Sequence, residues 1–276
     1  MIARLIGAVL RAILVVMLIA TPALMLPGTT EDIAQIVTLV AIFAAALTIF
    51  EYASSYPGLV EFRDAPPFNR IRYLSLFATV FLLSTMARGT VEPTNLTILV
   101  ESVGRLIGSI IDFPYSPVRL VVLMLPPDST VAEIETVRSS AGIAYLISLF
   151  TLTLFLIIQR LISWPLGSGS FNVWVNLPTF DPTAGGDVVE RLSRDARFNI
   201  ALGFLLPFVM PTIVNAASSL FGAITLDNPH TLIWTVAAWA FLPASLFMRG
   251  IAMGRIASMI REKRRRAADD ADLLTV

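Results

Sequence analysis

One charge-free stretch, residues 198–226, holds most of the groups that could do chemistry in an apolar environment. On a helix that turns by about 100° per residue, six of its small or polar residues share one sector about 120° wide: Gly203, Pro207, Pro211, Asn215, Ser218 and Gly222. Small residues let a second helix approach closely, and each proline leaves one backbone carbonyl without its helical N–H partner. The pattern indicates either a kinked packing face or a broken helix that lines a path for a solute.

Other candidates for catalysis or ligand binding are few. The chain has no cysteine and a single histidine, His230, which follows Asp227, Asn228 and Pro229 in a turn. A metal site needs several ligands, so we interpret His230 as a turn residue. The glycine-rich segments 167–170 and 182–187 match neither a P-loop nor a dinucleotide fingerprint, and we expect a flexible loop there. The sequence therefore predicts that the chain is not an enzyme and binds no cofactor and no metal.

Charged residues give no sign of an energised transporter. The centres of the apolar stretches contain no Asp, Glu, Lys or His, whereas ion pumps usually bury one at membrane depth. No segment in the first half of the chain repeats the Pro-x-x-x-Pro spacing, so the inverted repeat of many transporters is not indicated. Three arginines before the charge-free stretch stand among acidic residues, which favours a solvated, self-paired helix over a binding site: Arg191, Arg194 and Arg197.

Composition indicates the class of protein. Of the 276 residues, 56% are hydrophobic and 14% are charged, whereas an average soluble domain is about 25% charged. A helix needs about 20 residues to cross the hydrocarbon core of a bilayer. The sequence predicts an all-α polytopic membrane protein with six transmembrane helices in one domain, residues 1–266, the spans covering about 9–27, 33–50, 71–87, 141–161, 198–226 and 231–253.

The third span is the shortest of the six. Its charge-free part, residues 73–87, has 15 residues and lies between Arg72 and Arg88. Both arginines are therefore expected to snorkel, one to each membrane surface.

A long connection of mixed character follows. Residues 95–111 have the pattern of an amphipathic helix, with Gly104 and Gly108 spaced for close contact with another helix. The apolar octet 118–125 is too short to span a bilayer. We expect the helix to lie in the interface on the outer face, with a re-entrant pair covered by protein as the alternative. Residues 129–133 resemble the start of the next helix.

Basic residues are distributed unevenly. Nineteen of the 20 are arginine, which is typical of a GC-rich bacterial genome. Six spans place both ends on one side, and that side carries 16 of the 20 Lys and Arg residues against four on the other. Basic loops stay in the cytoplasm. The sequence predicts a multi-pass protein of the bacterial inner membrane with both termini cytoplasmic.

A basic run follows the sixth span. Its side chains are expected to bind lipid headgroups and fix the orientation, because each gains about 1 kcal/mol near an anionic leaflet: Arg261, Lys263, Arg264, Arg265 and Arg266. The run lacks interleaved aromatic residues, so we expect no nucleic-acid partner. Residues 267–276 show no packing pattern and are expected to form a flexible cytoplasmic tail.

Two functions are compatible with these patterns. The first is an integral membrane accessory, scaffold or assembly protein, whose Gly203–Gly222 face meets a helix of another subunit or of a second copy. The second is a channel or transporter for a small uncharged solute, with Asn215 and the Pro207/Pro211 break lining the path.

Overall fold

The computed structural model describes residues 2–162, 164–165, 171–181, 183, 185–221 and 226–274, with the backbone alone for 217–221 and 271–274. The chain is all-helical, 79% of it in helices, and no strand occurs among the described residues. Six helices are long and apolar enough to cross a membrane: α1 (Ile2–Met25), α2 (Glu31–Ala53), α3 (Phe68–Gly89), α6 (Val131–Leu161), α8 (Val188–Phe221) and α9 (Pro229–Leu274). Three are short: α4 (Asn95–Ile111), α5 (Pro117–Val122) and α7 (Val173–Asn176).

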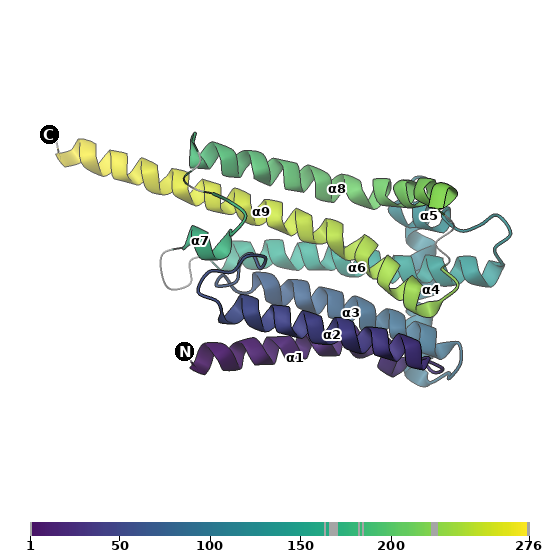
Figure 1. Cartoon of the computed structure of the whole chain (residues 1–276). Helices are drawn as coiled ribbons and strands as arrows, with labels where there is room; N and C mark the ends of the chain where they lie inside the picture. Colours follow the sequence, from purple (N-terminus) through teal and green to yellow (C-terminus); the bar gives the residue numbers. More distant parts are fainter. Residues whose placement is uncertain are drawn as a thin grey trace.

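The six long helices lie side by side along one common direction (Figure 1). Both chain termini lie at one end of this bundle, which we call the terminal end, and α7 lies there too. The short helices α4 and α5 lie at the opposite, distal end, where α4 runs across the bundle. All six predicted spans are thus present, and the amphipathic helix has the bounds that its pattern predicted.

Three long helices extend beyond the predicted spans, because helix continues into water once a span has nucleated it. The helix α6 starts ten residues earlier than the predicted span, at a capping box in which Thr130 and Glu133 bond to each other's backbone N–H. The helix α8 joins the solvated helix predicted around Arg191, Arg194 and Arg197 to the fifth span without interruption. The helix α9 continues through the basic run to Leu274, so the expected tail is helical, although residues 261–270 are exposed as a tail would be.

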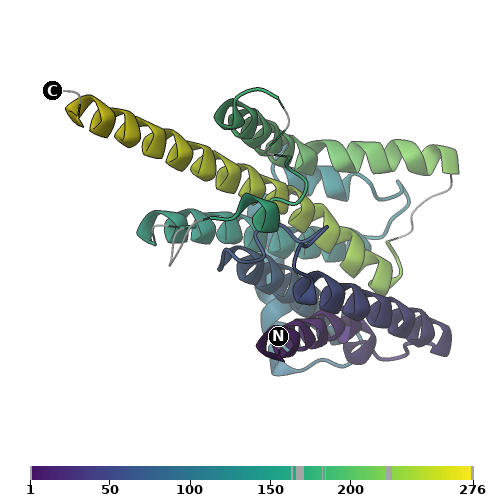
Figure 2. The ribbon, with the colours of Figure 1, turned by 60° about the vertical axis from the view of Figure 1, so that its left-hand side comes forward.

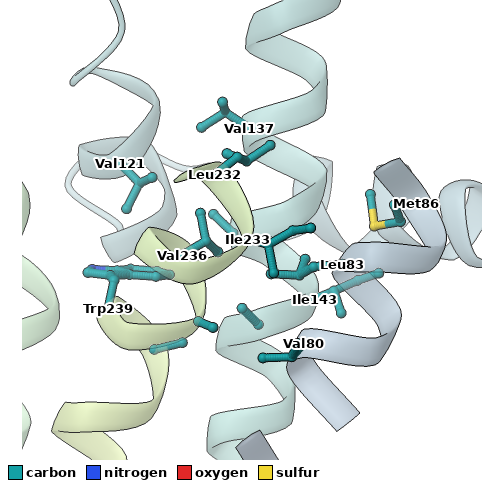
Figure 3. Packing of buried hydrophobic residues seen from close by; sticks show 14 of the residues in the cluster. Val80, Leu83, Met86, Val121, Val137, Ile143, Leu232, Ile233, Val236 and Trp239 are labelled. Carbon is teal, nitrogen blue, oxygen red and sulfur yellow. The ribbon is translucent and has the colours of Figure 1, made fainter. Parts of the chain in front are cut away.

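Two buried apolar clusters hold the helices together. The distal cluster joins α3, α6 and α9, with Val80, Leu83, Ile143 and Ile233 at its centre and with Val121 of α5 packed beside them (Figure 3). The terminal cluster is richer in aromatic rings and is built on Phe62, Phe68, Phe155 and Trp164, whose ring centres lie 4.4 to 6.3 Å apart.

The described part of the loop between α6 and α8 belongs to this terminal cluster. Trp164, Leu177 and Phe180 are buried in it, and α7 forms between the two glycine-rich segments for which a flexible loop was expected. Burial of large apolar side chains orders a segment whose sequence is rich in loop-forming residues.

The helix α2 is peripheral. Among the described helices it packs on α1 alone, and Figure 2 shows the α1–α2 hairpin at one side of the bundle. Of its 23 residues, only Ala41 and Glu51 are buried. Its outward surface carries polar side chains in the first two turns and is mainly apolar from Leu39 to Phe50, as expected for a helix that faces lipid or another membrane protein.

The helix α4 has three distinct faces. One face is buried on α6, where Gly108 and Gly142 meet so closely that a Cβ atom on Gly142 would stand 2.7 Å from the Cα of Gly108. The polar face carries Glu101 and Arg105. The third is apolar and exposed: Leu96, Leu99, Val103, Leu106 and Ile110. A transverse helix with separate polar and apolar exposed faces suits a membrane interface.

Candidate functional site

The first half of the sector predicted in α8 packs on α9 of the same chain. Gly203, Pro207 and Pro211 are buried. A Cβ atom on Gly203 would stand 2.7 Å from the carbonyl oxygen of Pro243 and 2.8 Å from the backbone nitrogen of Phe247. Glycine is needed here because the two backbones approach so closely. The face that we expected to meet a partner protein is covered, at these three residues, by the chain's own sixth spanning helix.

The contact is reciprocal one level nearer the terminal end. A Cβ atom on Gly250 would lie 2.7 Å from the carbonyl oxygen of Ala196 and 2.9 Å from the backbone nitrogen of Ile200. At Gly254, the next turn of α9, the same atom would meet the Cβ of Ala196 at 3.7 Å, which is ordinary van der Waals contact. The close approach between α8 and α9 therefore spans Gly203 and Gly250 and relaxes by Gly254.

The prolines do not break α8, which runs as a helix through both. Because Pro211 has no N–H, the carbonyl of Pro207 four residues earlier lacks its helical donor. The indole Nε1–H of Trp239 on α9 donates to this carbonyl over 3.0 Å. A polar neighbour thus uses the freed carbonyl, as the proline spacing predicted, and that neighbour belongs to the same chain.

The second half of the sector is less enclosed. Asn215 is exposed on α8. Ser218 is described in its backbone only, within α8, while Gly222 lies outside the described residues, as do the predicted glycine-rich segment 167–170 and Pro182. His230 opens α9, where the side chain of Asn228 accepts its backbone N–H over 2.8 Å.

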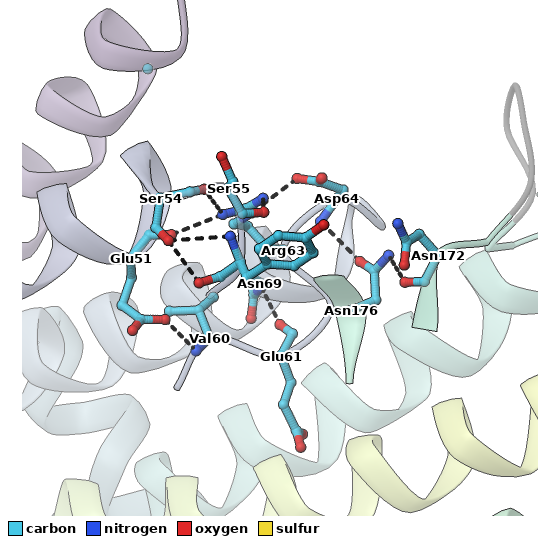
Figure 4. A network of polar contacts seen from close by, with 12 residues as sticks. Glu51, Ser54, Ser55, Val60, Glu61, Arg63, Asp64, Asn69, Asn172 and Asn176 are labelled. Carbon is cyan, nitrogen blue, oxygen red and sulfur yellow. Dashed lines mark hydrogen bonds and ion pairs between the residues drawn. The ribbon is translucent and has the colours of Figure 1, made fainter. Parts of the chain in front are cut away.

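A network of polar contacts covers the terminal end, and no sequence pattern predicted it (Figure 4). Its first anchor is Glu51, which is buried at the end of α2. The Glu51 carboxylate accepts hydrogen bonds from the backbone N–H groups of Gly58, Leu59 and Val60 at 2.9 to 3.1 Å. Arg63 donates back to the carbonyl oxygen of Glu51 over 3.0 Å. These contacts fold the α2–α3 loop over the end of its own helix.

The second anchor is an ion pair that joins this loop to α9. The guanidinium of Arg249 donates to both carboxylate oxygens of Glu61, with Nε–Oε2 at 2.6 Å and Nη2–Oε1 at 2.8 Å. Asn199 of α8 accepts from Nη1 of Arg249 over 3.0 Å, and Thr179 donates to Glu61 over 2.7 Å. A bidentate, half-buried pair of this kind is stronger than an exposed one. It fastens the α2–α3 loop, α8, α9 and the loop after α7 to one another.

Sequence reasoning missed this ion pair because its members lie 188 residues apart. A signal existed in the isolated position of Arg249 between Met248 and Gly250, at the end of an apolar span. The basic-residue distribution uses Arg249 only as a marker of topology and does not point to Glu61 as its partner.

Arg72 differs from its prediction. Rather than snorkelling into water, its side chain lies between α3 and α9, with its Cζ atom 5.4 Å from the ring centre of Phe68 and 5.8 Å from that of Phe241. Its Nη1 donates to Asn69 over 3.3 Å, and its Nε is buried without a hydrogen-bond partner. Arg88, at the other end of α3, is exposed and pairs with Glu92 as the snorkelling prediction implies.

The distal end has its own charged contacts. Asp112, whose side chain is 5% exposed, lies 2.8 Å from Nε of Arg119 and 2.8 Å from Nε of Arg138. These distances are those of ion pairs, although neither Oδ1 of Asp112 nor Nε of Arg138 meets hydrogen-bond geometry. The contacts tie α5 and α6 to the end of α4.

A cavity of about 220 Å³ lies near these pairs, between α3, α4, α6 and α9. Arg105 lines it and pairs with Glu101 at 2.8 Å and with Glu135 at 3.4 Å. Ser139 also lines it, and its buried Oγ has no hydrogen-bond partner. The remaining lining is mostly apolar.

The predicted lipid-binding run is part of the helical extension of α9. Its side chains Arg261, Lys263, Arg264, Arg265 and Arg266 are exposed. Arg264 pairs over 2.7 Å with Asp187, which precedes α8, and this hydrogen bond together with the Val189 N–H lowers the pKa of the Asp187 carboxyl. Arg266 pairs with Glu262 one turn away. Two of the five basic side chains are therefore engaged by carboxylates of the same chain.

Neither metal-binding groups nor similarity to known proteins indicates a function. Within the described residues, no group of three or more His, Cys, Asp or Glu side chains is placed to hold a metal ion. Comparisons with protein-family models, with curated proteins and with solved structures find no match to this chain. A functional proposal therefore depends on the geometry of the chain itself.

Proposed function

We propose that this chain is an integral membrane accessory, scaffold or assembly protein, which acts through contacts between its helices and those of a larger membrane complex or of a second copy. The observation that carries the proposal is the exposure of α2. This spanning helix is attached through α1 alone among the described helices, and it presents the rest of its surface outward.

The outward surface of α2 includes a shallow groove near its start. The groove is lined by small and polar residues together with two apolar ones: Ala34, Gln35, Thr38, Leu39 and Ile42. Small side chains allow helices to approach closely in membranes, and polar side chains hydrogen-bond across them. The groove therefore suits a second helix better than it suits disordered acyl chains.

The closed seam between α8 and α9 supports this proposal over passage of a solute. The Pro207 carbonyl, which could have lined a path, is occupied by Trp239. At the level of Gly203, the space next to α8 is filled by the backbone of α9. These groups serve packing within the chain.

The test is a gentle purification from the native membrane, followed by sizing and identification of co-purifying chains. We expect the wild type to elute with partner chains and Thr38→Leu, which fills the groove, to lose them. Ala46→Leu is the matched control, because Ala46 is exposed on the same helix about 12 Å farther along than Thr38. A wild-type protein that elutes as a lone monomer, or equal retention of partners by both variants, would contradict the proposal.

A channel or transporter for a small uncharged solute is the second candidate. The distal cavity favours it, because polar side chains, among them Ser139, stand in a mostly apolar lining. In liposomes, Ser139→Ala and Asn215→Ala should each change solute flux while expression stays constant. Unchanged flux in both variants for every solute tried removes this candidate.

For the location, we propose the bacterial inner membrane with the terminal end of the bundle in the cytoplasm, supported by the 16-to-4 distribution of basic residues. Because the chain has no cysteine, single cysteines can be introduced and labelled from either side. Asp269→Cys should react with a membrane-impermeant reagent only in inverted vesicles, and Glu92→Cys only in intact cells. The opposite pattern reverses the orientation.

A further inference from the structure

Among the described residues, Arg72 is a cation that forms no ion pair. It is half-buried in the first turns of α3, and its Nε is shielded from solvent without a hydrogen-bond partner. Its surroundings are the rings of Phe68 and Phe241 and one amide oxygen, that of Asn69. Within the described part of the chain, no carboxylate lies within ion-pair distance of Arg72.

The carboxylates of this region are already engaged. Both oxygens of Glu61 bind Arg249, and one also accepts from Thr179. The carboxylate of Glu51 is occupied by three backbone N–H groups. Arg72 and Arg249 both interact electrostatically with Glu61, but Glu61 bonds to Arg249, and Asp195 also acts on Arg249. Arg72 therefore has no carboxylate of its own at bonding distance among the described residues.

The depth of the Arg72 guanidinium in the bundle makes its lack of an ion-pair partner more costly. Phe241, one of the two rings beside Arg72, precedes Arg249 on α9 by eight residues, or about 12 Å toward the middle of the span. The guanidinium thus lies where water gives way to the apolar interior. An uncompensated charge there is costly, and charged side chains inside membrane spans usually mark a binding or transport function.

We propose that Arg72 binds the phosphate group of an anionic phospholipid from the leaflet at the terminal end of the bundle. A planar guanidinium matches phosphate oxygens in geometry and charge, and basic pockets between spanning helices are known to bind anionic headgroups. Exposed apolar side chains of the neighbouring helices α1 and α3 are available for the acyl chains, among them Leu10, Leu14 and Leu74. Free phosphate shares the headgroup chemistry and is separated from lipid by experiment.

The test compares the full chain with Arg72→Gln and Arg70→Gln in detergent. Arg70 is the matched control, because it lies two residues away on the same helix and is exposed. Native mass spectrometry counts phosphatidylglycerol retained after exchange into phosphatidylglycerol–phosphatidylcholine mixed micelles. The thermal midpoint is measured with phosphatidylglycerol, with phosphatidylcholine and with inorganic phosphate.

We expect the wild type and Arg70→Gln to retain phosphatidylglycerol in preference to phosphatidylcholine and to be stabilised by it. Arg72→Gln should retain it about ten- to a hundredfold less, the effect of losing a charge-assisted hydrogen bond. Arg72→Lys preserves the charge without the planar fork and should show intermediate retention, which keeps the comparison available if Arg72→Gln fails to fold. Stabilisation by inorganic phosphate that depends on Arg72 supports the anion site with a free ion as its source. Equal responses of the Arg70 and Arg72 variants, or no preference of the wild type for the anionic lipid, would overturn the proposal.

Discussion

The seam between α8 and α9 allows a sharp test of how the bundle is held together. Replacing Gly203 by alanine adds one methyl group at a point where its carbon would stand 2.7 Å from the Pro243 carbonyl oxygen and 3.0 Å from the Cα of Phe247. Both neighbours are backbone atoms, so no side-chain rotation can make room. The two helices must separate by several tenths of an ångström for the variant to fold.

The magnitude follows from two opposing effects. Inserting one methyl group into a fully packed contact costs about 1–3 kcal/mol. Alanine favours a helix over glycine by about 1 kcal/mol, which offsets part of this cost. We therefore expect Gly203→Ala to lower the free energy of unfolding by up to about 2 kcal/mol. Gly250→Ala should have a similar effect, because its Cβ would stand 2.7 Å from the Ala196 carbonyl oxygen.

The chain supplies a matched control in Gly254, where an added Cβ would meet only the Cβ of Ala196, at 3.7 Å. Gly254→Ala carries the same chemical change and should leave stability unchanged or raise it. The assay is reversible unfolding in mixed micelles, followed by the helical signal at 222 nm. The double variant of Gly203 and Gly250 should cost less than the sum of the two, since separation forced by one methyl group makes room for the other. Equal stabilities of the Gly203 and Gly254 variants would refute close backbone packing as the reason for these glycines.

Three further predictions address the polar contacts. Trp239→Phe keeps an aromatic ring and removes the N–H donor to the Pro207 carbonyl, so the free energy of unfolding should fall by about 1–3 kcal/mol in the same assay. A value unchanged from wild type would show that this hydrogen bond contributes nothing to stability. Glu61→Gln leaves Arg249 without its carboxylate and should loosen the α2–α3 loop, which would be measured as faster amide hydrogen exchange in that loop. Unaltered exchange would count against the Glu61–Arg249 ion pair as an anchor of the loop. The folded-state pKa of Asp187 is lowered by its hydrogen bond from α9, so this contact is fully present above about pH 4 and is lost as the pH falls through the lowered pKa. The distribution of distances between spin labels on the start of α8 and the end of α9 should then broaden. A distribution that stays constant under acid would contradict the contact.

The spans could be predicted from sequence because crossing a bilayer imposes a length and an apolarity that each segment shows by itself. The start of α6 could also be predicted, since a capping box lies within four residues, Thr130 to Glu133. The carbonyl freed by Pro211 was foreseeable as well, because its cause is local. In each case the determining interaction is short in sequence.

The rest depends on contacts between distant residues. Whether the Gly203 face met another protein or α9 could be told only from the positions of Pro243 and Phe247 opposite it. The bond between Glu61 and Arg249 joins residues 188 positions apart. The length rule for Arg72 predicted snorkelling, but the rings of Phe68 and Phe241 hold its side chain between two helices. The burial of Trp164 and Leu177 was hidden by the glycines and prolines of the surrounding sequence.

The length of α9 has a mechanical consequence. Its 46 residues make a rod of about 69 Å, more than twice the thickness of a hydrocarbon core. From Arg249 to Leu274 the rod extends about 37 Å past the anchor that Arg249 forms with Glu61. Part of this extension is still held by the bundle, because Ile256 and Ala257 are buried and Arg264 pairs with Asp187 before α8. A tilt of α9 would therefore also move the start of α8, and only the ten residues after Arg264, about 15 Å of helix, extend beyond that contact.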